Sequence, residues 1–498
     1  MAILLGIDLG TSGIKILAVN EKGEILASAS EAYPLIQPQA GWAEQNTEDW
    51  WQGFLKAVKQ IIADPAVKTS DIKALSLSGQ MHGSVFLDKD GKVIRNPLLW
   101  NDTRTHRQCE YITKTVGEKK LLEMVGNPAL EGFTLPKLIW LRDNEPENYK
   151  KVKTLFLPKD YIVYRLTGKL STEMSDAAGS LLLDVKNRKW SEDLCGALDI
   201  DPGILPPVIE STDIAGTISS QASAETGLPI GVKVIGGGAD NACGAVGNGI
   251  VEEGIVLASI GSSGVVLAHS NKMEYDPHGR IHSFNHSVPH NWYLMGVTLS
   301  AGLSMSWMKN NLFKTDYDTI NSEAASVHAG SKGLIFLPYI SGERTPHRDP
   351  MARGAFIGLS GIHEQKHMMR SVFEGVSFAL KDSLELIKGL GVKPKQIRVT
   401  GGGAKSNLWR QILADVFNKD VVTMQADEGP AYGAALIAGV GAGTWSDLPE
   451  AVQKTVRVGK TTKANPKDAE TYDKIYPLFK SLYQSLKNDF RTAYELNN

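Results

Sequence analysis

The sequence predicts an α/β protein built from two related domains. Strand-like segments alternate with helical ones along the chain, which is typical of an α/β fold. A strand–glycine turn–strand segment occurs twice, half a chain apart, and such self-similarity indicates related domains. The length of 498 residues agrees with this, because it exceeds what one hydrophobic core supports.

The first half opens with strands and a helix. Short runs rich in Ile, Leu, Val and Ala, separated by glycine turns, predict strands at 3–9, 14–20, 24–33 and 72–78. Between the last two strands, apolar side chains recur at helical spacing, so we expect a helix over residues 48–63.

The second half repeats this opening. Residues 257–270 resemble residues 6–20, with Gly261 and Gly264 at the places of Gly10 and Gly13. A glycine-rich stretch at 244–254 marks the boundary, so we expect an N-terminal domain over 1–246 and a C-terminal domain over 247–498. Further strands are expected at 334–338 and 397–400, and helices at 365–390, 407–417 and 469–494.

The composition excludes several classes of function. The formal net charge is −2 and the basic residues are scattered, so nucleic acid is not an expected partner. Three cysteines without CxxC spacing suit a reducing compartment and give no disulfide framework. The N-terminus lacks the basic region of a signal peptide, and no apolar run reaches the roughly 20 residues that cross a bilayer, so we expect a cytoplasmic protein without a membrane partner.

The turn at Gly10–Gly13 is the first candidate site. Its glycines allow backbone N–H groups to approach phosphate oxygens, and Thr11 and Ser12 add hydroxyls. Asp8, just before the turn, is a candidate Mg²⁺ ligand, because that ion keeps several waters and takes few carboxylates. A plain hairpin turn explains the same residues, but the second copy favours two turns that grip one polyphosphate. Ser259 replaces Asp8 in that copy, so the metal is expected on the side of the first turn.

Two more strands end in glycines that are followed by a helix. At 234–247 the glycines deliver Asp240 and Asn241, where the carboxylate is either a general base or the cap of the next helix, and the residues alone favour the cap. At 398–417 a helix starts after three glycines, which is typical of an anion or nucleotide site, although a compact loop explains it too. The chain has no GxGxxG and no complete Walker A motif, so neither a Rossmann site nor a P-loop is expected.

The segment from His363 to His367 matches the HExxH pattern of zinc proteases. The predicted helix that it enters has its apolar stripe elsewhere, and both histidines are in phase with polar residues such as Arg370 and Glu374. A catalytic zinc helix turns its histidines into a cleft instead. We therefore expect no zinc site here.

Taken together, these segments resemble the FGGY family of carbohydrate kinases, within the actin–hexokinase–Hsp70 superfamily. Both family signatures have counterparts, one at 132–144 (GFTLPKLIWLRDN) and one between Gly354 and Glu374, and the resemblance covers essentially the whole chain. It implies two actin-like (ribonuclease H-like) domains that flank a catalytic cleft, with sugar bound mainly by the first and ATP mainly by the second. It also places His367 at a polar position of the second signature, which explains the HExxH match as an accident.

Within the family, the chain is most similar to members that phosphorylate D-xylulose. The segments that carry this similarity are LSGQMHG, LLWNDTR, LPKDY, MSDAAGS, GGGADNACGAVG and YISGERTPH. Members that act on glycerol have Arg-Glu where this chain has Met81 and His82. The resemblance implies ATP- and Mg²⁺-dependent transfer to O5 of D-xylulose in pentose catabolism, with ribulose, gluconate or a deoxyketose as the alternative acceptor.

The resemblance also assigns roles to single residues. It implies that Asp240 is the catalytic base, and that the sugar is bound by Met81, His82, Asp240 and Asn241. The residues implied near ATP are Gly10, Thr11, Ser12, Lys15, Ser262, Gly302, Gly403 and Asn407. The family's second turn has a threonine where this chain has Ser262, which keeps the hydroxyl. Whether the chain forms a homodimer is left open.

A filament protein or a chaperone of the same fold is the rival from another class. Those proteins lack a GQMHG-type segment, and an Hsp70 has a separate peptide-binding domain for which this chain has no room. The resemblance therefore favours a sugar kinase over either of them.

Overall fold

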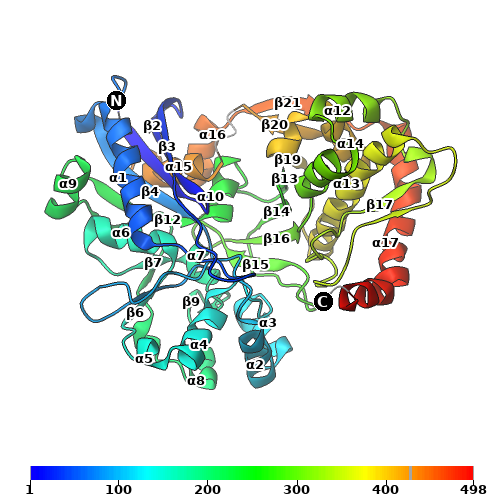
Figure 1. The fold of residues 1–498 in the computed structure, drawn as a ribbon. Coiled ribbons are helices and arrows are strands. Elements are labelled where there is room, and N and C mark those ends of the chain that lie inside the picture. Colours follow the sequence, from blue (N-terminus) through cyan, green and yellow to red (C-terminus); the bar gives the residue numbers. More distant parts are fainter. Residues whose placement is uncertain (1, 426–428, 497–498) are drawn as a thin grey trace.

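The computed structural model describes residues 2–425 and 429–496 of the chain. Two large sheets lie side by side in it, each with helices packed against it (Figure 1). The first has six strands in the order β11-β12-β4-β1-β2-β3. Their bounds are β1 Ile3–Leu9, β2 Gly13–Asn20, β3 Ile25–Ala32, β4 Ile72–Gly79, β11 Ile214–Thr217 and β12 Lys233–Ala239.

The second sheet has seven strands in the order β15-β16-β14-β13-β19-β20-β21. Their bounds are β13 Ile255–Ile260, β14 Gly264–Ser270, β15 His282–Asn285, β16 Trp292–Thr298, β19 Gln396–Thr400, β20 Val421–Met424 and β21 Val458–Thr462. Its first two strands, β13 and β14, are the hairpin that repeats β1 and β2 in the sequence.

The two sheets share one topology. β1 is antiparallel to β2 and parallel to β4, and β13 is antiparallel to β14 and parallel to β19. The next strands also correspond, because β12 and β20 continue the parallel part and β11 and β21 close it in the opposite direction. The α/β class and the repeated strand–turn–strand unit are thereby confirmed.

Helices cover the first sheet on both faces, which explains its nearly continuous burial. The odd residues of β1, such as Ile7, pack in one cluster with Trp50 and Phe54 of α1 (Thr47–Ala63). Leu4 packs on the other side with α15 (Gly429–Ala442), although that helix belongs to the second half of the sequence.

Helix α15 also crosses α10 (Asp240–Gly247) at close range. A Cβ at Gly433 would overlap the Cys243 carbonyl oxygen, and one at Gly6 would overlap the carbonyl oxygen of Ala431. These glycines let the two helices and β1 approach each other to backbone contact. Because α15 returns to the first sheet, the two halves share a core, and the boundary between residues 246 and 247 stays a prediction.

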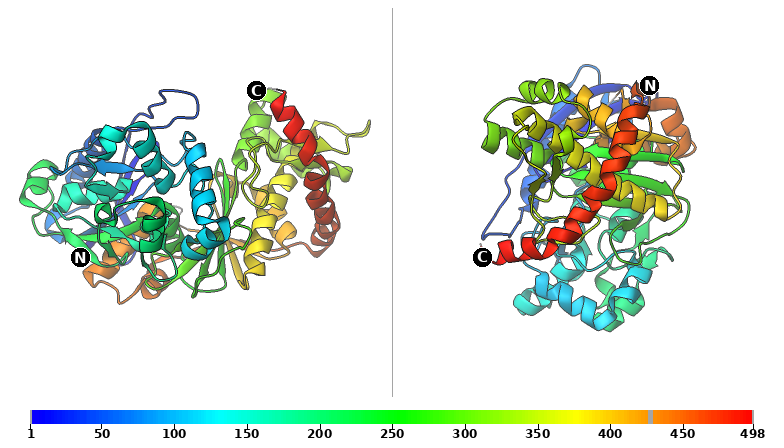
Figure 2. Two further views of the ribbon diagram at one scale, coloured as in Figure 1. Left: turned by 90° about the horizontal axis from the view of Figure 1, so that it is seen from below. Right: turned by 90° about the vertical axis from the view of Figure 1, so that its right-hand side faces the viewer.

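The predicted helices of the second half are confirmed at nearly the expected bounds. They are α13 (Gln365–Gly389), α14 (Asn407–Phe417) and α17 (Pro466–Glu495). The Ser406 hydroxyl caps α14 by accepting the Trp409 N–H at 3.1 Å. Figure 2 shows α17 along the outer side of the second half.

The remaining elements surround the two sheets. The helices are α2 His106–Val116, α3 Glu118–Val125, α4 Thr134–Asn144, α5 Pro146–Tyr149, α6 Pro158–Thr167, α7 Met174–Ala178, α8 Glu192–Leu198, α9 Ser220–Thr226, α11 Gly302–Trp307, α12 Tyr317–Ala325 and α16 Leu448–Thr455. The short strands are β5 Val85–Leu87, β6 Thr154–Phe156, β7 Thr172–Glu173, β8 Leu183–Asp184, β9 Lys189–Trp190, β10 Val208–Ile209, β17 Ile335–Leu337 and β18 Ala355–Ile357. Among the residues that the structure describes, no helix has the length and apolarity needed to cross a membrane.

The polar side of α13 is buried, because α17 covers it. Arg370 donates from Nε to Glu374 at 2.8 Å and from Nη2 to the Tyr472 hydroxyl of α17 at 2.7 Å. The Tyr472 hydroxyl donates in turn to Glu374 at 2.9 Å. The periodicity that separates these residues from the apolar stripe therefore marks a buried polar network, which the pattern alone does not reveal.

Candidate active site

The ends of three parallel strands bring the first group of predicted residues together. In the first sheet β1, β4 and β12 run parallel, with Asp8 opposite Ser78 and Gly79 opposite Ala239. The segments that follow β4 and β12 therefore leave the sheet at the same edge as the turn after Asp8. Met81 and His82 come from the first of them, and Asp240 and Asn241 from the second.

Asp240 begins α10, but it does not cap that helix. The N-cap residue is Ala239, and Asp240 Oδ1 instead accepts from the backbone N–H of Asn241 at 2.7 Å and from its side-chain amide at 3.0 Å. The carboxyl group is only partly exposed, and burial, together with the nearby charge of Asp8, raises its pKa to about 7. It can therefore both accept and release a proton near neutral pH.

The other predicted sugar residues lie beside Asp240. The Asn241 amide also donates to Met81 Sδ at 3.6 Å, so α10 and the segment after β4 are in direct contact. The His82 ring lies 4.5 Å from the Phe133 ring, and its Nδ1 lies 2.6 Å from the Gly179 carbonyl oxygen. Because that carbonyl can only accept, Nδ1 carries the proton and Nε2 is an acceptor. Burial lowers the pKa of His82 to about 3, so the ring is neutral.

Helix α4 fixes the backbone of His82, a role that the sequence did not reveal. His82 has a positive φ of 68°, and its carbonyl oxygen accepts from Thr134 Oγ1 at 3.1 Å and from Lys137 Nζ at 2.8 Å. Lys137 is fully buried, and its ammonium also donates to the Gly132 carbonyl at 2.6 Å. The first family signature thus holds the predicted sugar segment, which contains Met81 and His82, in a backbone conformation that a non-glycine residue rarely adopts.

A buried charge cluster lies behind Asp240. Lys159 Nζ is 2.6 Å from Asp160 and 3.6 Å from both Glu173 and Asp176. Burial raises the pKa of Asp176 well above its usual range, and within the described residues neither of its oxygens has a hydrogen bond. Glu173 accepts from the Ser175 hydroxyl at 2.9 Å, and that hydroxyl accepts the Ala239 N–H at 3.0 Å. The cluster thereby supports the turn that presents Asp240.

Asp8 and Lys15 face each other across the first hairpin, on either side of the glycine turn. Burial raises the pKa of Asp8, while Ser78 and Lys15 oppose the rise. Asp8 Oδ1 is buried and has no hydrogen-bond partner among the described residues. An orphaned carboxylate oxygen beside a phosphate-type turn fits a Mg²⁺ ion that keeps most of its waters.

The first turn has fewer donors available than its sequence suggests. The Thr11 hydroxyl already donates to Gln80 Oε1 at 3.2 Å and accepts from Trp100 Nε1 at 2.9 Å. Ser12 is exposed, and the Gly10 carbonyl accepts from the Tyr33 hydroxyl. The Gly10 N–H is also taken, because it donates to the Gly13 carbonyl at 3.0 Å. The turn therefore offers an anion the Ser12 hydroxyl and the N–H groups after Gly10 rather than the Thr11 side chain.

The second group of predicted residues lines a cavity of about 890 Å³ in the second half. Ser262, Gly302, Gly403 and Asn407 all contribute to it, whereas the residues of the first turn do not. Parallel strands again explain the convergence, because β13 and β19 end side by side and lead into Gly261 and Gly401. The Gly302 N–H donates to the Gly261 carbonyl at 2.9 Å, which ties the start of α11 to the second turn.

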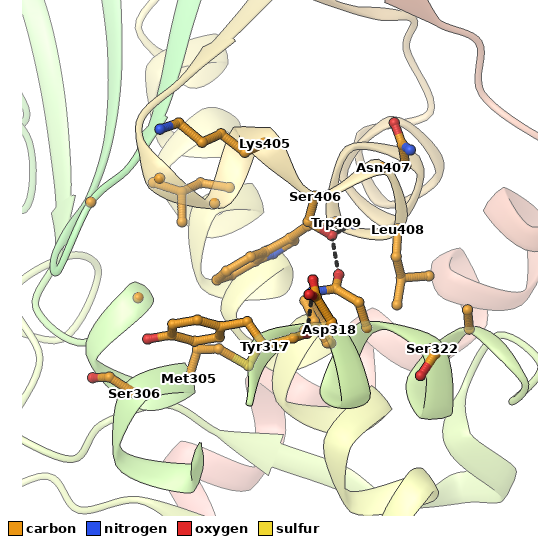
Figure 3. A pocket seen from close by; sticks show the side chains of 18 of the residues that line it. Met305, Ser306, Tyr317, Asp318, Ser322, Lys405, Ser406, Asn407, Leu408 and Trp409 are labelled. Atoms are coloured by element: carbon orange, nitrogen blue, oxygen red, sulfur yellow. Dashed lines mark hydrogen bonds between the residues drawn. The ribbon is translucent and has the colours of Figure 1, made fainter. Parts of the chain in front are cut away.

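Other residues of this cavity were not predicted. Figure 3 shows Tyr317, Ser406 and Trp409 around it, and the Ser406 hydroxyl bonds to Asn321 of α12. Aromatic rings combined with amides and hydroxyls suit a planar, hydrogen-bonding base. The signal that leads to Ser406 and Trp409 is their place directly after the three glycines at 401–403.

The arrangement combines a proton acceptor, groups that hydrogen-bond to hydroxyls, and two glycine turns suited to phosphates. Such a set matches phosphoryl transfer to an alcohol, which needs positioning and charge stabilisation more than covalent chemistry.

Comparison with known proteins points the same way. Residues 3–247 match the N-terminal domain of the FGGY family of carbohydrate kinases, and residues 256–442 match its C-terminal domain. The xylulose kinase of Bacillus subtilis (strain 168) is 42% identical over 494 residues, which cover 99% of each protein.

Solved structures agree over the whole chain. A ligand-bound xylulose kinase from Lactobacillus acidophilus has a TM-score of 0.94 at 29% identity, and the match covers 99% of this chain and 100% of that one. A gluconate kinase from the same organism has a TM-score of 0.93, also at 29% identity, with 99% of each chain covered.

Proposed function

The chain belongs to the FGGY family of carbohydrate kinases, and we propose that it transfers the γ-phosphoryl group of ATP to O5 of D-xylulose. The products are D-xylulose 5-phosphate and ADP. The observation that carries the proposal is the contact between Asp240, Asn241 and Met81, which puts a carboxyl group with a pKa of about 7 beside the predicted sugar segment. The xylulose kinases among the relatives support the choice of sugar.

Asp240 is the proposed general base. As O5 attacks the γ-phosphorus in line, the proton of the O5 hydroxyl passes to the Asp240 carboxylate. The bond from the γ-phosphorus to the bridging oxygen breaks and releases ADP. A positioned base of this kind contributes roughly 10²- to 10⁴-fold in rate. Positioning of the two reactants and stabilisation of charge supply most of the rest.

The sugar is held by Met81, His82 and Asn241 in this proposal. The neutral His82 ring has its Nδ1–H bonded to Gly179, so Nε2 can accept a sugar hydroxyl. The Asn241 amide offers both a donor and an acceptor, and Met81 packs against the carbon chain. Hydroxyl groups are thus recognised by groups whose own orientation is already fixed.

The phosphates are held by the two turns. In this proposal the phosphates contact the backbone of Gly10 and Thr11, the Ser12 hydroxyl, Lys15 and Ser262. The rest of ATP lies near Gly302, Gly403 and Asn407 in the 890 Å³ cavity. Asp8 would hold Mg²⁺ through water, and the ion would offset the negative charge of the phosphates.

The cellular setting is part of the proposal. The three cysteines are buried free thiols, the state expected in a reducing compartment, so we propose a cytoplasmic enzyme of pentose catabolism. A homodimer stays a prediction.

A panel of acceptors tests the proposal. ADP release is measured with D-xylulose, D-ribulose, L-ribulose, gluconate and glycerol. We expect the highest kcat/KM for D-xylulose. If another acceptor is preferred by tenfold or more, about 1.4 kcal/mol in transition-state binding, the sugar assignment is wrong.

The second candidate is a gluconate kinase. It is favoured by one observation, the match to the gluconate kinase structure, which is as close as the match to the xylulose kinase structure from the same organism. The same panel decides between them, because gluconate has a carboxylate where the ketose has a hydroxymethyl ketone.

A further inference from the structure

One arginine of the second half belongs to neither group of predicted site residues. Arg344 lies in the loop between β17 and β18, and both of its neighbours are buried and anchored to β16. Glu343 Oε1 accepts the Leu299 N–H at 3.0 Å, just past the end of β16. The Thr345 N–H donates to the Val297 carbonyl at 3.0 Å, and Thr345 Oγ1 accepts the Val297 N–H at 3.1 Å. The backbone of Arg344 is therefore held at a defined place.

That place is next to the strands that line the predicted sugar segment. Thr345 Oγ1 also donates to the Arg280 carbonyl at 2.8 Å, two residues before His282 at the start of β15. Aromatic rings then lead from β15 to the sugar segment: the His282 and Phe133 rings are 6.0 Å apart, and the Phe133 and His82 rings 4.5 Å. This chain of contacts places Arg344 near His82, whereas Asp240 is joined to Met81 through Asn241.

The Arg344 guanidinium has no partner among residues 2–425 and 429–496. It forms neither a hydrogen bond nor an ion pair with any residue that the structure describes. In the same loop, Arg348 has its guanidinium bonded to Glu118 and to the His278 carbonyl, at 2.7 and 2.8 Å. Arg344 is also less exposed than Arg348, and burial lowers its pKa although the charges of Glu131 and Glu343 oppose this.

The positive charge of Arg344 affects the pKa of two histidines at or near the predicted sugar segment. It contributes to lowering the pKa of both His82 and His282, after the larger effect of burial. A guanidinium offers five N–H donors and no acceptor, so its natural partner is a set of oxygen lone pairs. A ligand bound at His82 would supply such oxygens.

We propose that Arg344 is a substrate-binding residue that recognises the end of the sugar remote from the phosphorylated hydroxyl. Its guanidinium donates hydrogen bonds to the carbonyl oxygen O2 and the adjacent hydroxyl O1 of the ketose, while O5 lies at Asp240. This proposal rests on the proposed function for the orientation of the sugar. It makes the loop of the second half a specificity determinant of a site that is otherwise built by the first half.

The test compares Arg344→Ala and Arg344→Gln with the matched control Arg348→Ala. We expect the KM for D-xylulose to rise roughly 10- to 100-fold in both Arg344 variants, because a hydrogen bond from a charged donor is lost. The kcat, the KM for ATP and the slow hydrolysis of ATP without sugar should stay within threefold. Xylitol, which lacks the carbonyl, should lose much less from Arg344→Gln than D-xylulose does.

Three results would overturn the inference. A folded Arg344→Ala with an unchanged KM for sugar is the first. A raised KM for ATP with unchanged sugar binding is the second, because it would assign the arginine to the nucleotide. The third is a Glu131→Gln variant with the same rise in the KM for D-xylulose, because that result would mean that Arg344 acts as the ion-pair partner of Glu131.

Two controls keep the outcome clear. If Arg344→Ala melts at a lower temperature than the Arg348→Ala control, Arg344→Lys replaces it, and its single ammonium should give an intermediate rise in KM. The acceptor panel on the unmodified enzyme is run first. If it prefers another sugar, the proposed function fails, and the Arg344 variants are measured with the preferred sugar, so that the two failures are distinguishable.

Discussion

The two glycine turns, at residues 10–13 and 261–264, have similar backbones and different chemistry. In the first, Asp8 lies opposite Lys15 across the hairpin, whereas in the second Ser259 lies opposite Val265. Both halves keep the parallel strands that end at one edge, but only the first has a carboxylate, Asp8, on the strand before its glycine turn.

The difference between the turns shows which tasks each half of a duplicated fold is suited to perform. A turn built from glycines needs only backbone N–H groups to meet a phosphate, so both copies can keep that role. Proton transfer and metal binding need carboxylates with perturbed pKa values, and Asp8 and Asp240 of the first half have them. The cavity of the second half is lined by hydroxyls, amides and rings, such as Ser406, Asn407 and Trp409, and by the charged residues Asp318 and Lys405.

The largest expected effect comes from Asp240→Asn, which removes from the first half the carboxyl group that is proposed as the base. The amide keeps the size of the side chain but cannot accept the proton from O5. We expect kcat to fall by roughly 10²-fold or more while D-xylulose still binds in calorimetry. Near-normal turnover would contradict the role of Asp240 as the base.

A matched control exists in the second half. Asp382 of α13 is also buried, and burial raises its pKa to about 7, but its Oδ1 accepts from the Tyr476 hydroxyl at 2.6 Å, away from both predicted groups. Asp382→Asn should leave kcat within threefold. The pair of variants separates a perturbed pKa that serves catalysis from one that only reflects burial.

The second effect is that of Asp8→Asn, with Ser259→Ala as its counterpart in the other turn. We expect Asp8→Asn to lower kcat/KM for ATP by about 10- to 100-fold and to raise the Mg²⁺ concentration needed for half-maximal rate, whichever acceptor is present. Ser259→Ala should change neither by more than twofold. Equal losses in both variants would contradict the division between the turns.

Much of this division was readable in the sequence, because the first turn contains Asp8 where the second contains Ser259. The glycines at 236–238 and 401–403 also marked the strand ends correctly. Lys137 and Lys159 were not predicted, because a lysine in a helical segment is usually solvated, and only the packed structure shows that both are fully buried. A role for Arg344 was not predicted, although its segment YISGERTPH is among those that carry the resemblance, because only the contacts through Thr345 bring this loop close to β15.

The third effect is a dependence of kcat/KM on pH, which follows from the raised pKa of Asp240. Asp240 must be ionised to accept a proton, and burial sets its pKa at about 7, so kcat/KM for the sugar should fall about tenfold per unit as the pH drops below 7. His82 does not cause this decline, because burial keeps its pKa near 3 and the ring neutral. His82→Gln and Asp382→Asn should therefore retain the decline, measured as kcat/KM from pH 5 to 9. Its absence in the unmodified enzyme would remove the support for Asp240 as the base.

The smallest effect is expected at the HEQKH segment, which lies at the start of α13 in the second half. His367 Nδ1 accepts the Glu364 N–H at 3.0 Å, and His363 Nδ1 accepts the Ser360 N–H at the same distance. These bonds shape the entry to the helix, so His367→Ala should cost about 1 kcal/mol of stability, as the loss of a helix cap does. Because neither histidine lines the 890 Å³ cavity or contacts Asp240, both alanine variants should keep kcat/KM within twofold, and the purified protein should hold no stoichiometric zinc. Loss of activity with a zinc-selective chelator in excess Mg²⁺ would indicate a functional zinc site in the second half. It would contradict the expectation that the metal is bound on the side of the first turn.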